Sequence, residues 1–204
     1  MSPLVVTPEE IIDEDRVDMD KIEYYRNLMA QKFELVLPVS VVVIFLPPTL
    51  RFFPQHRLMS EENLERIFYD TLAQRLEIPE FIRDMKMSAH RLMYYSYSHI
   101  QEIGARYRAD QCLIIGYDIE ISHPSTCLGF WPLSYKHGFL KSEIVLLDTR
   151  TGFVLLVERY SLSQKSSGGT LAGDREKEII VGLISEWTAL LSEDILNFYR
   201  AETD

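Results

Sequence analysis

Residues 148–152, Asp-Thr-Arg-Thr-Gly, contain the residue types that a phosphate-binding or catalytic loop would use. An anion site of that kind needs backbone amides that point at the ligand from the start of a helix. Here, runs typical of strands stand on both sides, at 141–147 and 153–161. The segment is therefore predicted to be a short hairpin turn, with a glycine bulge that needs positive φ. Its structural residues would be Asp148, Thr151 and Gly152.

Three possible metal ligands, His123, Cys127 and His137, share one stretch of the chain. Their spacings of four and ten residues match no standard zinc pattern, and no fourth ligand is obvious nearby, so no metal site is predicted. Neither a nucleophile-elbow motif nor a cysteine–histidine signature occurs, and residues 162–174 lack the order of a P-loop. The chain is therefore predicted to be no enzyme and to hold no cofactor.

A basic stretch within residues 81–95 is the first candidate for a binding surface. The segment is predicted as a partly exposed strand, with one face formed by Phe81, Arg83, Met85, Met87 and Ala89. Cations interleaved with methionine and tyrosine are favoured at adaptable interfaces. The same pattern also fits methionines and tyrosines in a core beside solvated cations. The interface reading assigns partner contact to Arg83, Lys86, Arg91, Tyr94 and Tyr95.

Residues 122–139 are predicted to be a long loop, because they are rich in proline, glycine and aromatic residues. Long loops without regular structure are often functional, and an exposed tryptophan is a typical anchor in an interface. The loop is the second candidate for partner binding. Its contact residues would be Phe130, Trp131 and Tyr135.

Periodicity predicts one α/β domain over 38–204, preceded by an acidic arm over 1–37 with a short helix at about 18–32. The β-branched run at 39–45 would be an interior strand, and the run at 111–121 would be a strand whose second half alternates. Apolar residues at three-to-four spacing predict helices at about 61–77, 97–108 and 174–200, and 162–174 is predicted to be a flexible loop.

A net charge of −10 argues against a protein that binds duplex nucleic acid. The longest apolar run, 35–48, is too short for a membrane span and contains Pro38. No signal peptide is present in the chain as given. Two cysteines, Cys112 and Cys127, are too few for a disulfide scaffold, and whether they pair stays open.

Three segments resemble a known group of proteins: VVVIFLPPTL, then HIQEIGARYRADQCLIIGYDIE, then SEIVLLDTRTGFVLLVE. The group is that of periplasmic lipoprotein domains related to the curli secretion lipoprotein, the amino-terminal domain of TolB and the activators of penicillin-binding proteins. The resemblance implies an α/β fold with a mixed sheet of about four to five strands flanked by helices, of TolB-N-like or anticodon-binding-domain-like topology. It also implies that Ala109-Asp110 and the Asp148–Gly152 turn are structural.

The resemblance further implies a non-enzymatic cell-envelope lipoprotein domain in the periplasm, held at the outer membrane by a lipid anchor that is absent from this chain. Such a domain would contact a protein partner, as an accessory or regulatory part of an envelope or secretion assembly. The chain departs from the group in that no lipidated cysteine stands near residue 1. The 122–139 segment is also too short and too rich in proline and glycine for channel-forming hairpins, so no pore is expected. The alternatives are a small soluble cytoplasmic enzyme or ligand-binding domain with a pocket near 122–139, and a homo-oligomer built on a sheet edge.

Overall fold

A computed structural model describes most of the chain from residue 35 onward. The described residues are 35–46, 61–76, 78, 80–89, 97–122, 125–128, 131–134, 136–166 and 172–203. The side chains of residues 61, 97, 125–128, 131–134 and 172–175 are not described. The helix predicted at 18–32 lies outside these ranges.

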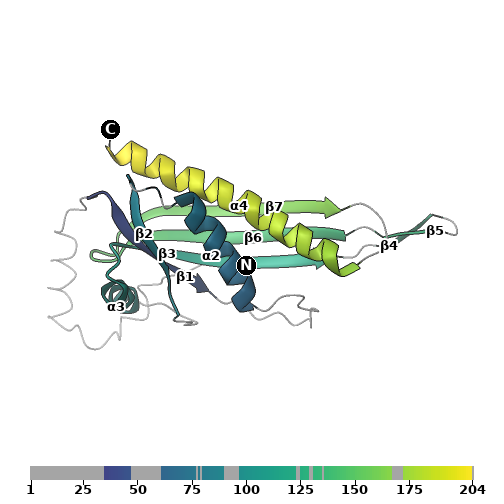
Figure 1. Cartoon of the computed structure of the whole chain (residues 1–204), viewed down its shortest axis with the longest axis horizontal. Helices are drawn as coiled ribbons and strands as arrows, with labels where there is room; N and C mark the ends of the chain where they lie inside the picture. The colour runs from purple at the N-terminus through teal and green to yellow at the C-terminus, as the bar shows by residue number, and fades with distance from the viewer. Residues whose placement is uncertain are drawn as a thin grey trace, which may run out of the picture.

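A five-stranded mixed sheet forms the centre of the fold (Figure 1). In the order β2-β1-β3-β6-β7, its strands are Ile82–Met87, Val39–Leu46, Gln111–Ser122, Lys136–Asp148 and Val154–Ser166. β1 runs parallel to both of its neighbours, β2 and β3, whereas β3 pairs with β6 and β6 pairs with β7 in antiparallel orientation. The predicted mixed sheet of four to five strands is confirmed.

The three described helices are α2 (Glu61–Leu76), α3 (Tyr97–Tyr107) and α4 (Ala172–Thr203). The connection from β1 through α2 leads outward to β2, and the connection through α3 leads back across β1 to β3. Crossovers between parallel strands are right-handed, so two that move in opposite directions place their helices on opposite faces. Accordingly α2 packs beside α4 on one face, and α3 packs on the other (Figure 1).

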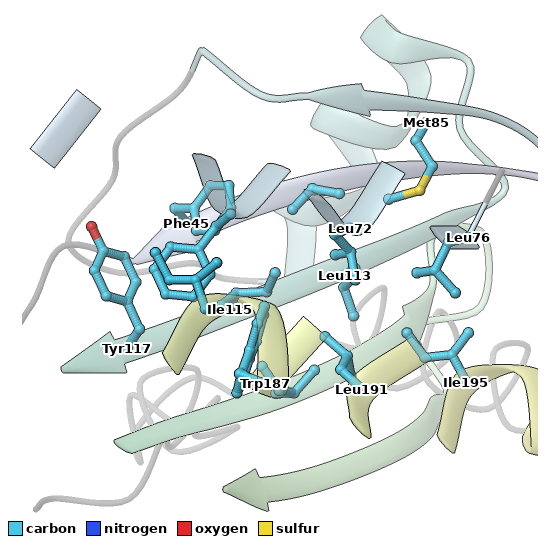
Figure 2. Close-up of a cluster of buried hydrophobic side chains, with 14 of the residues drawn as sticks. Phe45, Leu72, Leu76, Met85, Leu113, Ile115, Tyr117, Trp187, Leu191 and Ile195 are labelled. Carbon is cyan, nitrogen blue, oxygen red and sulfur yellow. The ribbon is translucent and has the colours of Figure 1, made fainter. Parts of the chain in front are cut away.

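The main core lies between the sheet and the pair α2 and α4 (Figure 2). α2 contributes Phe68, Leu72 and Leu76, which recur every four residues, and each is at most 1% exposed. Trp187 of α4 lies at the centre, with its ring edge-to-face against Phe68 at a centroid distance of 4.9 Å. Its indole N–H donates to the Ser142 hydroxyl at 2.5 Å, so the buried polar end of the ring is satisfied.

A smaller core lies under α3, on the opposite face of the sheet. Ile100 and Ile103 of the helix pack against alternate residues of the strands, because side chains alternate between the faces of a sheet. The strand residues are Val42, Ile44, Cys112, Ile114, Val145 and Leu147. Two-sided burial explains why β1 and the first half of β3 are apolar without alternation.

The prediction of an irregular loop at 122–139 is wrong. β3 and β6 stay paired as far as Ser122 and His137, and two short strands follow, β4 (Ser125–Leu128) and β5 (Trp131–Ser134). Proline and glycine in this segment favoured a loop. Pro132 nevertheless fits in β5, because β4 and β5 form a two-stranded sheet and, within the described residues, each strand has a partner on one side only. The segment is a hairpin that projects from the main sheet (Figure 1).

Two further boundaries differ from the sequence-based expectation. β7 continues to Ser166, into the stretch predicted as a flexible loop, because it pairs with β6 as far as Lys136. The strand predicted over 81–95 is confined to Ile82–Met87 within the described residues, and residues 90–96 lie outside them. Over the described ranges, none of the helices combines the length and the apolar character that a bilayer crossing requires.

Trp187→Ala is expected to reduce the free energy of unfolding by about 3–5 kcal/mol, because it leaves a cavity in the main core and an unpaired Ser142 hydroxyl. Urea titration followed by circular dichroism measures the change. Leu190→Ala, at a side chain of the same helix that is 38% exposed, is the matched control and should cost less than about 1 kcal/mol. Similar losses for both variants would contradict the assignment of Trp187 to the core.

Candidate functional site

The Asp148–Gly152 segment is a tight turn between β6 and β7. The Asp148 carboxylate accepts the Thr151 amide at 2.7 Å and also the Thr151 hydroxyl. Gly152 has φ of 72° and donates its N–H to the Asp148 carbonyl at 2.8 Å. Since Asp148 and Thr151 are 6% and 3% exposed, their polar groups serve the turn itself rather than a ligand.

Thr149 joins this turn to the end of α3. Its hydroxyl lies 2.7 Å from the Ala109 carbonyl oxygen and 2.9 Å from that of Asp110, and its amide donates to the Asp110 carbonyl at 3.0 Å. Helix and turn are so close at Gly104 that an added Cβ would lie 2.6 Å from Thr149 Cβ. The Ala109-Asp110 and Asp148–Gly152 segments, 38 residues apart, therefore meet as one structural joint.

Sequence reasoning missed Thr149 and Gly104 as members of this joint. The resemblance drew attention to Thr151, whose hydroxyl stays inside the turn, and not to Thr149, whose hydroxyl leaves it. The one available signal was a glycine within the predicted helix 97–108, since such a glycine often marks a close approach of another segment.

Arg83 and Lys86, two of the predicted partner-binding residues, lie in a cluster of paired charges beside this joint. Lys86 forms an ion pair with Asp84 at 2.8 Å and donates to the Tyr107 carbonyl at 3.0 Å. Arg83 donates to the Ser40 hydroxyl at 2.8 Å and lies 3.7 Å from the Asp110 carboxylate. The two cations are thus balanced by two aspartates.

The hydrogen bond from Lys86 is the main cause that lowers the pKa of Asp84 below its usual 3.8, and the hydrogen bond from Ser40 adds to it. Asp84 therefore stays charged as a partner for Lys86 throughout the neutral range. The cluster joins β1, β2 and the start of β3, because Ser40 also exchanges hydrogen bonds with Asp110 through both of its backbone groups.

The prediction that Arg83 and Met85 share one face is wrong. The pairing of β1 with β2 shifts between Val39 and Ser40, so that Ile82 and Asp84 have partners and Arg83 is skipped. Met85 is buried in the main core, whereas the Arg83 guanidinium reaches Ser40 on the other side of the sheet. Arg91, Tyr94 and Tyr95 lie outside the described residues, so their role stays a prediction.

The second set of predicted contact residues belongs to the β4–β5 hairpin. Trp131 begins β5 and is paired with Leu128 of β4, while Phe130 and Tyr135 lie outside the described residues. The base of the hairpin is fixed to α4: Lys136 forms an ion pair with Glu176, with both side chains under 15% exposed. Gly138 lies so close to Ile179 that a Cβ there would overlap it.

Cys112 and His137, which the structure describes among the groups considered for chemistry, lie near opposite ends of the β3–β6 pairing. Cys112 is fully buried in the core under α3, and this burial raises the pKa of its thiol to about 12, so it is no nucleophile. His137 lies at the base of the hairpin, at the opposite end of β6 from Asp148. His123 and the Cys127 side chain lie outside the described part, and the absence of a metal site stays a prediction.

A depression of about 500 Å³ lies between α3 and the β6–β7 turn. It is lined by Gln101, Gly104, Ala105, Arg108, Ala109, Asp110, Thr149 and Arg150. This place differs from the pocket near 122–139 that the alternative hypothesis expected. It combines small residues of the helix with two arginines that belong to different elements.

Comparison with known proteins identifies the fold and no family. No family model matches the sequence, and no curated protein matches it. A putative neuraminyllactose-binding hemagglutinin homologue from Helicobacter pylori has a similar structure, with a TM-score of 0.53 and 9% identity over 79% of this chain and 91% of that chain. The α/β fold is therefore shared with that protein.

Weaker similarities include two bacterial lipoproteins. A putative lipoprotein from Caulobacter crescentus has a TM-score of 0.43 and 9% identity, over 79% of this chain and 91% of that one. Lipoprotein GNA1162 from Neisseria meningitidis has a TM-score of 0.38 and 15% identity, over 77% of this chain and 99% of that one.

Thr149→Val is expected to reduce the free energy of unfolding by about 1–3 kcal/mol, because it removes the hydroxyl donor and keeps the shape of the side chain. Thr149→Ser, which keeps the hydroxyl and loses one methyl group, is the matched variant and should lose about 1 kcal/mol or less. Urea unfolding measures both changes. A larger loss for serine than for valine would show that the hydroxyl does not hold the joint.

Proposed function

We propose that this chain is the folded domain of a bacterial cell-envelope lipoprotein, tethered in the periplasm to the outer membrane, and that it works by contacting a protein partner. The motif resemblance of residues 39–200 supports the envelope assignment, and bacterial lipoproteins stand among the structures that resemble the chain. A binding role also agrees with the description of the H. pylori protein, whose fold is shared.

The projecting β4–β5 hairpin is the observation that carries the proposal of partner contact. The sequence from the end of β4 into β5 is apolar over six consecutive residues, Leu128-Gly129-Phe130-Trp131-Pro132-Leu133. Apolar residues with a central tryptophan are typical of the anchors that carry most of the binding energy in an interface. The hairpin projects while its base is held against α4, so the strands β4 and β5 can be presented to a partner at low cost in conformational entropy.

The 83–97 segment has a smaller share in this proposal than the sequence suggested. Arg83 and Lys86 are held by Asp84, Asp110 and Ser40, and a cation that is already paired gains less from a new partner. Arg91, Tyr94 and Tyr95 keep their proposed role as a second contact.

Fractionation of the native protein from its source cells tests the envelope assignment. The expected result is a membrane-associated species whose intact mass includes a lipid modification at a residue upstream of Ser2. A soluble species of unmodified mass would rule the assignment out.

Photo-cross-linking tests the hairpin. A benzophenone amino acid in place of Trp131 is expected to give one dominant protein adduct in intact cells, because the tip contacts the partner directly. The matched control carries the same group in place of Leu190, on the outer face of α4, and should give no such adduct. Equal adducts from both positions, or none from either, would contradict a binding role for the hairpin.

A further inference from the structure

β7 is the last strand of the main sheet, and within the described residues no strand lies on its far side (Figure 1). It is long for an edge strand, with 13 residues from Val154 to Ser166. Its pairing with β6 is irregular only near the start, between Leu146 and Leu147 of β6, and is unbroken from Leu156 onward. An unpaired edge of this kind is a template for a further strand.

The features that usually protect an edge are sparse in β7. Proline, bulges, exposed charges or a short length keep other strands away from most edges. The sequence VLLVERYSLSQKS contains no proline and no glycine, and its one lysine, Lys165, stands near the end. The Arg159 guanidinium donates to the Glu143 carboxylate at 2.6 and 2.8 Å, so this charge is already met. The middle of the edge, residues 156–163, keeps little of the usual protection.

The hydrogen-bond pattern shows which backbone groups of β7 face the open edge. The Asp148 N–H donates to the Phe153 carbonyl at 2.9 Å, so Asp148 of β6 faces β7. The pairing of β3 with β6 has no irregularity, so β6 alternates regularly and its even-numbered residues bond to β7. Their partners in β7 are also even-numbered, from Leu156 to Ser166. The odd-numbered residues within 157–165 therefore direct their N–H and C=O groups outward.

The same alternation divides the side chains of β7 between the two faces of the sheet. On the face of α4, Leu156, Tyr160 and Leu162 are half-buried and pack against the main core. The Tyr160 hydroxyl donates to the Asp194 carboxylate of α4 at 2.6 Å. Leu190, one turn earlier on the same side of that helix, is 38% exposed. The edge is thus bordered on the α4 side by apolar side chains that are only partly covered.

The opposite face of β7 is polar beyond Val157. The odd-numbered residues there are exposed: Arg159, Ser161, Ser163 and Lys165. The core under α3 includes residues of β6 but no described residue of β7. A strand added to this edge would therefore have one face beside α4 and the other in water.

We infer that the edge of β7 binds an extended segment of a protein partner, which joins the main sheet as an additional strand. Main-chain hydrogen bonds to the outward groups of 157–165 supply affinity, and alternate side chains supply specificity. The segment carries apolar side chains on the α4 side and polar ones on the other. Glu158 lies on the α4 side and forms no ion pair within the described residues, so it favours a basic residue opposite it. The inference deepens the proposed partner contact and rests on it.

A second copy of the chain suits this edge less well. α4 packs against β7 and crosses it on one face of the sheet (Figure 1). A two-fold axis at the edge would place the second α4 on the same face at the same crossing, so the two helices would compete for space. A segment without such a helix avoids this conflict.

Amide hydrogen exchange of the full chain, resolved by NMR, tests whether the edge is open. The outward amides of Arg159, Ser161 and Ser163 should exchange at least about tenfold faster than those of Tyr160 and Leu162, which bond to β6. Equal protection of both sets would mean that the edge is already occupied, by the chain itself or by a second copy, and would overturn the inference.

Photo-cross-linking in intact cells tests the added strand. A benzophenone amino acid in place of Ser161 should give an adduct with another protein. Ser163→Pro removes an outward N–H and no bond to β6, so it should reduce the yield of this adduct about tenfold or more. Ser163→Thr keeps the N–H and is the matched control, with a yield within about twofold.

Glu158→Lys leaves the backbone unchanged and should also lower the yield, because it places a cation opposite the expected basic residue. It keeps the test decisive if proline destabilises the fold. A yield that neither Ser163→Pro nor Glu158→Lys lowers would overturn strand addition. An adduct between two copies of the chain, an adduct within one chain, or no adduct would each overturn the assignment to a protein partner.

The edge and the proposed function can fail separately. An adduct at Trp131 without one at Ser161 would keep the proposed function and remove the edge as a binding site. An adduct at Ser161 that Ser163→Pro abolishes, from a native protein without lipid modification, would keep the edge and remove the envelope assignment.

Discussion

The contact of Thr149 with the end of α3 is the constraint on which the arrangement of this fold depends most. One side chain from the β6–β7 turn bonds the carbonyls of Ala109 and Asp110, at the place where the helix gives way to β3. Asp110 in turn exchanges hydrogen bonds with Ser40 of β1. Four elements are therefore fixed relative to one another by a few short polar contacts, and the missing Cβ of Gly104 is the condition that lets them approach.

The regular elements were predictable because local patterns determine them. Phe68, Leu72 and Leu76 revealed α2 by their spacing, the glycine at 152 revealed the β6–β7 turn, and the uninterrupted apolar run of β1 revealed an interior strand. The hairpin at 125–134 was not predictable in this way. Its strands are short, and β5 contains Pro132. The hairpin follows a pairing of β3 with β6 that joins residues as far apart in the sequence as Gln111 and Asp148.

For the site residues, too, the sequence predicts local features and misses those that depend on contacts between distant parts of the chain. Arg83, Asp84 and Lys86 are close in the sequence. The register shift between Val39 and Ser40 determines which side chains of β2 face the main core and which face the opposite side of the sheet. The joint of Thr149 with Gly104 also depends on a contact between residues 45 positions apart. Local periodicity carries no information about such a contact, whereas a backbone outlier such as Arg108 becomes visible only in three dimensions.

β6 connects the β4–β5 hairpin with the joint at α3. It runs without interruption from Lys136, at the base of the hairpin, to Asp148, at the joint with α3, and it is paired on both sides over most of that length. Thirteen residues of strand span about 40 Å. A force applied to the Lys136 end of this strand would act along it and load its hydrogen bonds to β3 and β7 in shear, so that many would have to break together. We therefore expect the domain to resist extension along β6, so that a force applied at the hairpin would reach the α3 joint.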